Sequence, residues 1–152
     1  MPELIANRLK IRKKEIMKDM FCHSGEETSV VLHRDDWASH DQIWRGSFEG
    51  RKIGTGITVI FFSTDEIGKG PRWHVHPYDE VFIVRKGRAF FTIGDQMVQA
   101  SEGDILLGPA NIPHKFHNLG PGRLETTDIH LSDRWIQSDL EDGALQSREK
   151  NK

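Results

Sequence analysis

Two segments decide the fold of this sequence: His74-Val-His-Pro-Tyr-Asp-Glu80 and Pro113-His-Lys-Phe-His-Asn118. The side chains of a β-strand alternate between its two faces, so residues of equal parity point the same way. His74, His76 and Glu80 are all even-numbered, and we expect them to share one face of a strand. Imidazole nitrogens and carboxylate oxygens are ligands for divalent transition metals. The first segment therefore predicts one wall of a metal site, to which His114 would come from a different strand.

Glycines and a proline frame the two segments at fixed distances. The first pattern runs Gly68, five residues, His74-x-His76, three residues, Glu80, six residues, Gly87. The second runs Gly103, five residues, Pro109, then Asn111, two residues, His114, three residues, Asn118, and fifteen residues separate Gly87 from Gly103. Together they resemble the two conserved motifs of the cupin superfamily. The sequence departs from that pattern at Asn111, where the family usually has glycine. Because Asn enters the left-handed backbone region more readily than other non-glycine residues, we expect the turn to close.

The resemblance implies an all-β domain, an antiparallel β-barrel or jelly roll (double-stranded β-helix), with a metal bound inside. Carried over by position, the metal ligands are His74, His76, Glu80 and His114. Four such ligands leave two positions open on an octahedral ion. We therefore expect one divalent transition metal per chain, with manganese or iron favoured and nickel, zinc or copper also compatible.

Short apolar runs alternate with turns along the chain, as is typical of a sandwich or barrel. The expected strands cover residues 30–32, 43–48, 57–62, 81–84, 89–93, 97–99, 105–107, 113–117 and 125–130. We divide the single domain into three parts. Residues 1–52 are an N-terminal arm and first strands, which complete the barrel or a dimer interface. Residues 53–132 form the cupin barrel core, and residues 133–152 are the C-terminal part.

Short helical segments are expected at both ends of the chain. Residues 3–20 carry apolar positions at near-helical spacing. At the other end, Ser132 or Asp133 can cap a short helix to Leu140, with Trp135 and Ile136 on its buried side, ahead of a polar, frayed tail.

Length, charge and cysteine content narrow the class of protein. The chain has 152 residues, enough for one domain with a real core, and a net charge of −2 with 29% charged residues. This balance does not indicate binding to nucleic acid or to an anionic membrane. A single cysteine, Cys22, excludes an internal disulfide, and no apolar run is long enough for a membrane span. We expect a cytoplasmic protein.

Two residues near the predicted ligands are candidates for catalysis. Tyr78 shares their parity, so its hydroxyl could act as a general acid or base, or its ring could line the cavity. Arg72 also shares that parity and could clamp a substrate carboxylate. We interpret His130, in the last predicted strand, as a core or interface histidine, and His117 should face outward from the barrel.

These features favour a metal-dependent enzyme that acts on a small, polar, anionic metabolite, with iron or manganese oxygenase (dioxygenase-like) chemistry preferred. A lyase or isomerase that uses the same ion as a Lewis acid is one alternative. A non-catalytic small-molecule-binding domain is another, since the cupin resemblance specifies the fold better than the activity. The expected partners are a small-molecule ligand and a second copy of the chain in a homodimer, with neither nucleic acid nor membrane.

Overall fold

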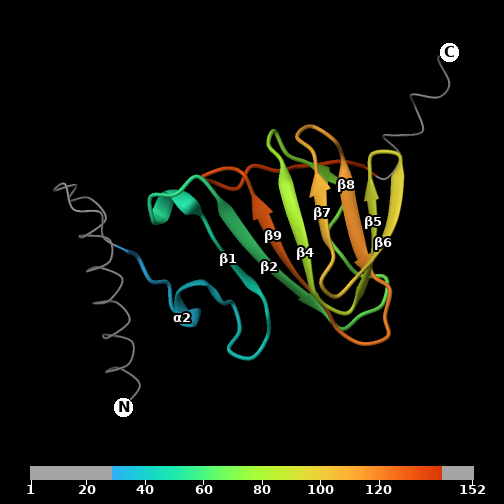
Figure 1. Cartoon of the computed structure of the whole chain (residues 1–152), viewed down its shortest axis with the longest axis horizontal. Helices are drawn as coiled ribbons and strands as arrows, with labels where there is room; N and C mark the ends of the chain where they lie inside the picture. The colour runs from blue at the N-terminus through green and yellow to red at the C-terminus, as the bar shows by residue number, and fades with distance from the viewer. Residues whose placement is uncertain (1–28, 142–152) are drawn as a thin grey trace.

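The computed structural model describes residues 29–141, which form two antiparallel β-sheets of five strands each (Figure 1). The first sheet has the order β1 (Gly46–Phe48), β2 (Thr58–Thr64), β9 (Leu124–His130), β4 (Glu80–Lys86), β7 (Ile105–Gly108). The second has the order β10 (Ser138–Asp139), β3 (His74–Val75), β8 (His114–Asn118), β5 (Arg88–Ile93), β6 (Gln96–Ser101). Within residues 29–141, hydrogen bonds do not join the two sheets into one closed barrel. The all-β jelly-roll prediction is confirmed, in the form of two facing sheets.

Helical structure within residues 29–141 is confined to α2 (Arg34–Trp37) and the 3-10 turn η1 (Gly50–Lys52). No helix in this part of the chain has the length and apolar character needed to cross a bilayer. The helix expected over residues 3–20 and the tail after 141 lie outside the described residues.

Two local predictions were wrong. Residues 30–32 have no strand pairing, and Val30 and Val31 are exposed. Residues 133–140 form no helix: Trp135 is 50% exposed and Ile136 is 44% exposed, so the chain there lacks a buried helical face. Ser138 and Asp139 instead pair with β3 as an edge strand. Long-range pairing of the backbone outweighs a weak local helical pattern at this point.

Alternating burial along the strands places one face of each sheet in a shared core. In β4 the buried residues are Glu80, Phe82 and Val84, and in β8 they are His114, Phe116 and Asn118. Phe82 and Phe116 belong to the apolar core, whereas Glu80 and His114 are polar continuations of the same inward-facing rows. The Phe82 ring also contacts the His114 ring, with centroids 5.4 Å apart. The polar site is therefore built on the end of the hydrophobic core.

Asn111 closes the turn before β8 as the sequence predicts. Its φ angle is 62°, in the left-handed region, and its N–H donates to the carbonyl of His76 at 2.8 Å. That hydrogen bond joins the two motif segments directly.

Candidate metal centre

Two cross-strand pairs, one in each sheet, build the site. His74 of β3 is the direct partner of His114 of β8, and Glu80 of β4 is the direct partner of His130 of β9. Directly opposed residues of antiparallel strands project from the same face with Cβ atoms about 5 Å apart. Strand register thus brings the two members of each pair together. The two pairs meet because the sheets face each other.

The expectation that His74, His76 and Glu80 share one face of a single strand was wrong. Strand β3 ends at Val75, and Glu80 begins β4 in the opposite sheet. The chain crosses from one sheet to the other between these residues, through Pro77. Glu80 therefore meets the histidines from across the interior.

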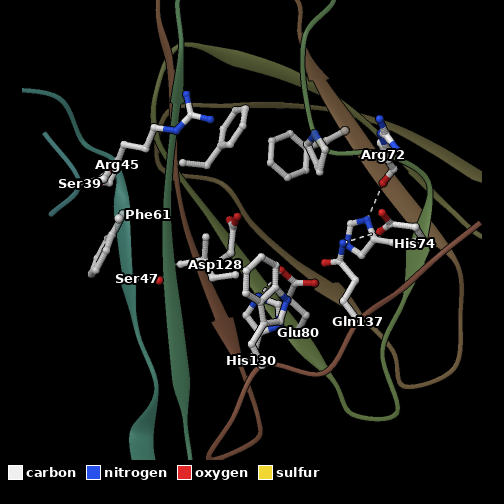
Figure 2. A pocket seen from close by; sticks show the side chains of 17 residues that line it. Ser39, Arg45, Ser47, Phe61, Arg72, His74, Glu80, Asp128, His130 and Gln137 are labelled. Atoms are coloured by element: carbon white, nitrogen blue, oxygen red, sulfur yellow. Dashed lines mark hydrogen bonds and ion pairs between the residues drawn. The ribbon is translucent and has the colours of Figure 1, made fainter. Parts of the chain in front are cut away.

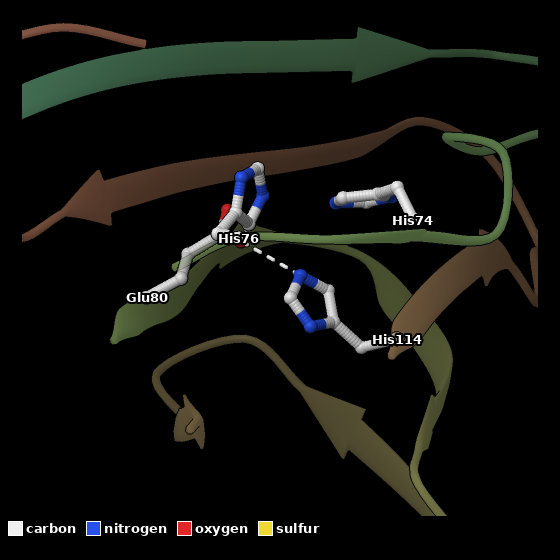
Figure 3. Close-up of side chains that lie close together, drawn as sticks. All are labelled: His74, His76, Glu80 and His114. Atoms are coloured by element: carbon white, nitrogen blue, oxygen red, sulfur yellow. Dashed lines mark hydrogen bonds and ion pairs between the residues drawn. The ribbon is translucent and has the colours of Figure 1, made fainter. Parts of the chain in front are cut away.

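Figure 3 shows the three imidazoles and the carboxylate turned toward a common centre. One ligand atom from each of His74, His76, Glu80 and His114 lies within 4.8 Å of the other three, and all four residues are buried. The Glu80 Oε2 atom lies 2.9 Å from Nε2 of His114 and 3.2 Å from Nε2 of His76. These residues could hold a divalent metal ion.

Backbone carbonyls orient the three imidazoles. The Nδ1 atoms of His74, His76 and His114 lie 2.5, 2.7 and 2.9 Å from the carbonyl oxygens of Arg72, Ile136 and Ile112, in that order. A carbonyl oxygen can only accept, so each Nδ1 carries the proton. In the neutral ring, Nε2 then presents a lone pair toward Glu80. This is the tautomer in which a histidine binds a metal through Nε2.

Burial and neighbouring groups keep His74 and Glu80 in the protonation states that a metal requires. Burial lowers the pKa of His74 to about 4, so this imidazole is neutral at pH 7. Burial alone would raise the pKa of Glu80, but the close approach of His114, His130 and His76 to its carboxylate outweighs this effect and holds the pKa below its ordinary value. Glu80 is therefore ionised at neutral pH.

The donor set fits a divalent cation. Nε2 of His76 is buried without a hydrogen-bond partner among the described residues, although Oε2 of Glu80 lies 3.2 Å away. With Nδ1 protonated, His76 and His114 direct their Nε2 lone pairs at one carboxylate oxygen at short range, and a cation among them turns that repulsion into attraction. Three nitrogens and one oxygen suit a first-row transition ion.

Sequence reasoning missed two residues of this cluster, both on β9. His130, interpreted from the sequence as a core or interface histidine, is buried, and its Nε2 lies 3.1 Å from Oε1 of Glu80. Asp128 is also buried, and its Oδ1 has no hydrogen-bond partner among the described residues. Burial and the nearby Glu80 raise the pKa of Asp128 well above its usual range. The one sequence signal for these two residues was that positions 128 and 130 are both even, which places both side chains on the same face of the last predicted strand.

A cavity of about 390 Å³ leads from the surface to this cluster. Glu80, His74, Asp128 and His130 line its buried end, and Arg45 and Arg72 line its exposed end. Figure 2 shows the two arginines on opposite sides of the cavity. Arg72 precedes β3 and Arg45 precedes β1, so the entrance lies between the two sheets.

Tyr78 packs beside the cluster without lining that cavity. Its ring stacks on His76 with centroids 5.1 Å apart. Its hydroxyl donates to the carbonyl of Ile136 and accepts from the N–H of the same residue, each at 2.9 Å. His117 points away from the ligand cluster, and its ring packs against Phe90.

Solved structures share this fold. A double-stranded β-helix protein from Klebsiella pneumoniae matches 76% of this chain and 100% of its own, with 18% identity and a TM-score of 0.59. Oxalate decarboxylase from Bacillus subtilis matches 69% of this chain but 32% of its own, with 18% identity and a TM-score of 0.57. At these identities the likeness concerns the fold alone.

Sequence comparison relates part of this chain to a known family. An uncharacterized protein of Streptomyces coelicolor is 29% identical over 82 residues, which are 54% of this chain and 73% of the relative. Residues 61–130 match the family model described as a cupin domain, and this segment contains all four candidate ligands. The family-model match over this segment, together with the jelly-roll fold and both motifs, supports membership of the cupin superfamily.

Proposed function

We propose that this protein is a metal-dependent enzyme that acts on a small anionic metabolite, with iron or manganese oxygenase chemistry. The observation that carries the proposal is the arrangement of three Nε2 atoms around one buried carboxylate at the end of a cavity. The bound ion would supply a Lewis-acid or redox centre with coordination positions left for substrate oxygens.

An anionic substrate is supported by the charges along the cavity. Arg45 and Arg72 add two positive charges at the entrance, and a divalent ion adds two more at the buried end. Glu80 offsets one of these, and Asp139 at the entrance offsets another. The remaining positive potential attracts carboxylates and concentrates them in a narrow, low-dielectric cavity. Arg72 is proposed to orient the substrate carboxylate through charge-assisted hydrogen bonds.

Tyr78 is proposed as a general acid or base, a role that requires its hydroxyl to leave the backbone of Ile136. The hydroxyl lies beside His76, and burial raises the pKa of Tyr78, which keeps the phenol protonated at neutral pH. A phenol in that state can donate a proton. Wild-type turnover by a Tyr78→Phe variant would exclude this role and leave the residue as a support for His76.

A lyase that uses the same ion is the second candidate, because a fold neighbour is named oxalate decarboxylase. A decarboxylation would use the same anion-binding arginines and the same open positions. The two candidates differ in their need for oxygen: an oxygenase consumes it, whereas Lewis-acid elimination or isomerisation does not. A non-catalytic binding domain is the third candidate, for which a ligand binds without any product.

The test begins with elemental analysis of tag-free protein purified without added metal or chelator. We expect near-stoichiometric iron or manganese. Oxygen uptake and product formation are then followed with oxalate and other small carboxylates, in air and under argon. Turnover only in air supports the oxygenase, turnover under argon supports the lyase or isomerase, and binding without product supports the third candidate. Absence of metal, together with no thermal stabilisation by added divalent ions, would contradict the proposal.

We also propose a homodimer. Exposed apolar side chains lie on an edge strand of each sheet, with Met97 on β6 and Ile105 and Leu107 on β7. Burial of such side chains against a second copy would stabilise the pair. Light scattering at monomer mass would contradict this proposal.

A further inference from the structure

His130 differs from the three candidate ligand histidines in what its ring nitrogens face. Each ligand candidate has Nδ1 on a backbone carbonyl, which directs the Nε2 lone pair toward the centre. Nδ1 of His130 has no hydrogen-bond partner among the described residues. Nothing therefore holds the proton of His130 on Nδ1, and its Nε2 is free to carry it as a donor.

The two oxygens of Glu80 face different groups. Oε2 lies toward Nε2 of His76 and of His114, and Oε1 lies toward Nε2 of His130 at 3.1 Å. This last contact has the distance of a hydrogen bond but does not meet its angular criterion, and the proposed donation requires the ring to reorient. The carboxylate is thus divided between the metal ligands on one side and His130 on the other.

Strand register places His130 in this position. His130 is the direct partner of Glu80 on β4 and of Thr58 on β2, so β9 is fixed from both sides at this residue. His130 is 1% exposed. A buried imidazole on a strand that is paired on both sides keeps its position when a ligand enters the cavity, whereas a residue on a loop would move more easily.

We propose that His130 is a positioning residue that donates from Nε2 to Oε1 of Glu80, so that only Oε2 is presented to the metal. This inference rests on the metal site of the proposed function. A hydrogen bond on Oε1 turns the carboxylate away from bidentate binding and so favours a single ligand oxygen, which leaves coordination positions to the substrate. The role also fixes the direction of Oε2 before the metal binds, which raises metal affinity.

Two polar variants of similar size test the donor. Gln places its amide nitrogen near the position of Nε2, and Asn places its amide nitrogen near that of Nδ1, out of reach of Glu80. We would titrate metal-free H130Q and H130N with Mn²⁺, following free Mn²⁺ by electron paramagnetic resonance. The reference for loss of a true ligand is H74Q. Thermal unfolding of each metal-free protein checks its fold, and His130→Ser replaces H130N if that variant does not fold.

We expect H130Q to bind Mn²⁺ within about threefold of wild type and H130N to bind about 10- to 100-fold more weakly. In the Co²⁺ forms, the visible absorption of H130N should fall relative to H130Q, because a second Glu80 oxygen raises the coordination number. Wild-type affinity in H130N would overturn the inference. Loss of affinity in H130Q equal to that in H74Q would also overturn it, since His130 would then be a ligand. Failure of the wild-type protein to bind Mn²⁺ or Co²⁺ would instead overturn the proposed metal site itself.

Discussion

Glu80 and His130 face each other as direct partners across strands β4 and β9, with Oε1 and Nε2 3.1 Å apart. The second sheet contains a matching pair, His74 and His114, across β3 and β8. The centre therefore depends on the register of both sheets and on the distance between them. Changes that shift either sheet should alter metal binding even when no ligand is replaced.

Replacement of a ligand should remove the metal without unfolding the protein. In His114→Gln one of three imidazoles is lost, and we expect the metal content of the purified protein to fall below about a tenth of the wild-type value, since even loss of a supporting residue costs 10- to 100-fold in affinity. Elemental analysis measures this. The control is His117→Gln on the same strand, whose side chain lies outside the cluster. Equal metal content in both variants would contradict the assignment of His114.

Asp128→Asn should stabilise the metal-free protein at neutral and alkaline pH. Burial, with Glu80 second, raises the folded-state pKa of Asp128 above the unfolded value of about 3.9. The folded protein then retains a proton that the unfolded chain releases, so the stability from Asp128 is complete below pH 3.9 and is lost as pH rises toward the folded-state pKa. The loss is about 1.4 kcal/mol per pH unit in that range.

Urea unfolding of metal-free wild type and Asp128→Asn at pH 4, 6 and 8 checks this prediction. The free-energy advantage of the variant should grow with pH over at least the first part of the series. Asp95→Asn, at an exposed turn, is the control and should show no such trend. A constant difference between wild type and Asp128→Asn would show that Asp128 is ionised normally.

Removal of a cavity arginine should weaken anion binding but leave metal binding unchanged. In metal-loaded protein, Arg72→Ala should bind oxalate about 5- to 10-fold more weakly, because a charge-assisted hydrogen bond is lost at a partly screened site. Isothermal titration measures both affinities. Arg72→Lys should recover part of the loss, and Arg88→Ala, outside the cavity lining, should behave as wild type. Unchanged oxalate binding in Arg72→Ala would remove the proposed substrate contact.

Gly70 should tolerate no side chain, because the segment before β3 lies directly against β8. A Cβ atom at Gly70 would sit 1.7 Å from the carbonyl oxygen of Phe116. Gly70→Ala should therefore push this segment away from β8, lower the free energy of unfolding by about 1–3 kcal/mol and weaken metal binding through His74.

The matched control for that prediction is Gly56→Ala, where a Cβ would meet no atom within 4 Å. Thermal unfolding of the two variants is compared under the same conditions. A melting temperature for Gly70→Ala equal to that of Gly56→Ala would mean that the segment relaxes without cost.

Local sequence signals determined much of this protein. The identity and spacing of His74, His76, Glu80 and His114, and the left-handed turn at Asn111, were predicted from the chain alone and agree with the cluster and the turn found. Eight of the nine expected strand segments overlap strands β1, β2 and β4 to β9. These features could be predicted from the sequence because alternating burial and turn conformation depend on residues that are close together in the chain.

Tertiary structure decided the rest. It carried Glu80 into the opposite sheet, aligned His130 with it, turned Arg45 toward the cavity, and made residues 138–139 an edge strand rather than part of a helix. Each of these depends on which strands pair and in which register, and that choice is set by contacts between residues far apart in the chain. Parity within one strand predicts which residues may share a face, but only the pairing of strands determines which residues of different strands meet.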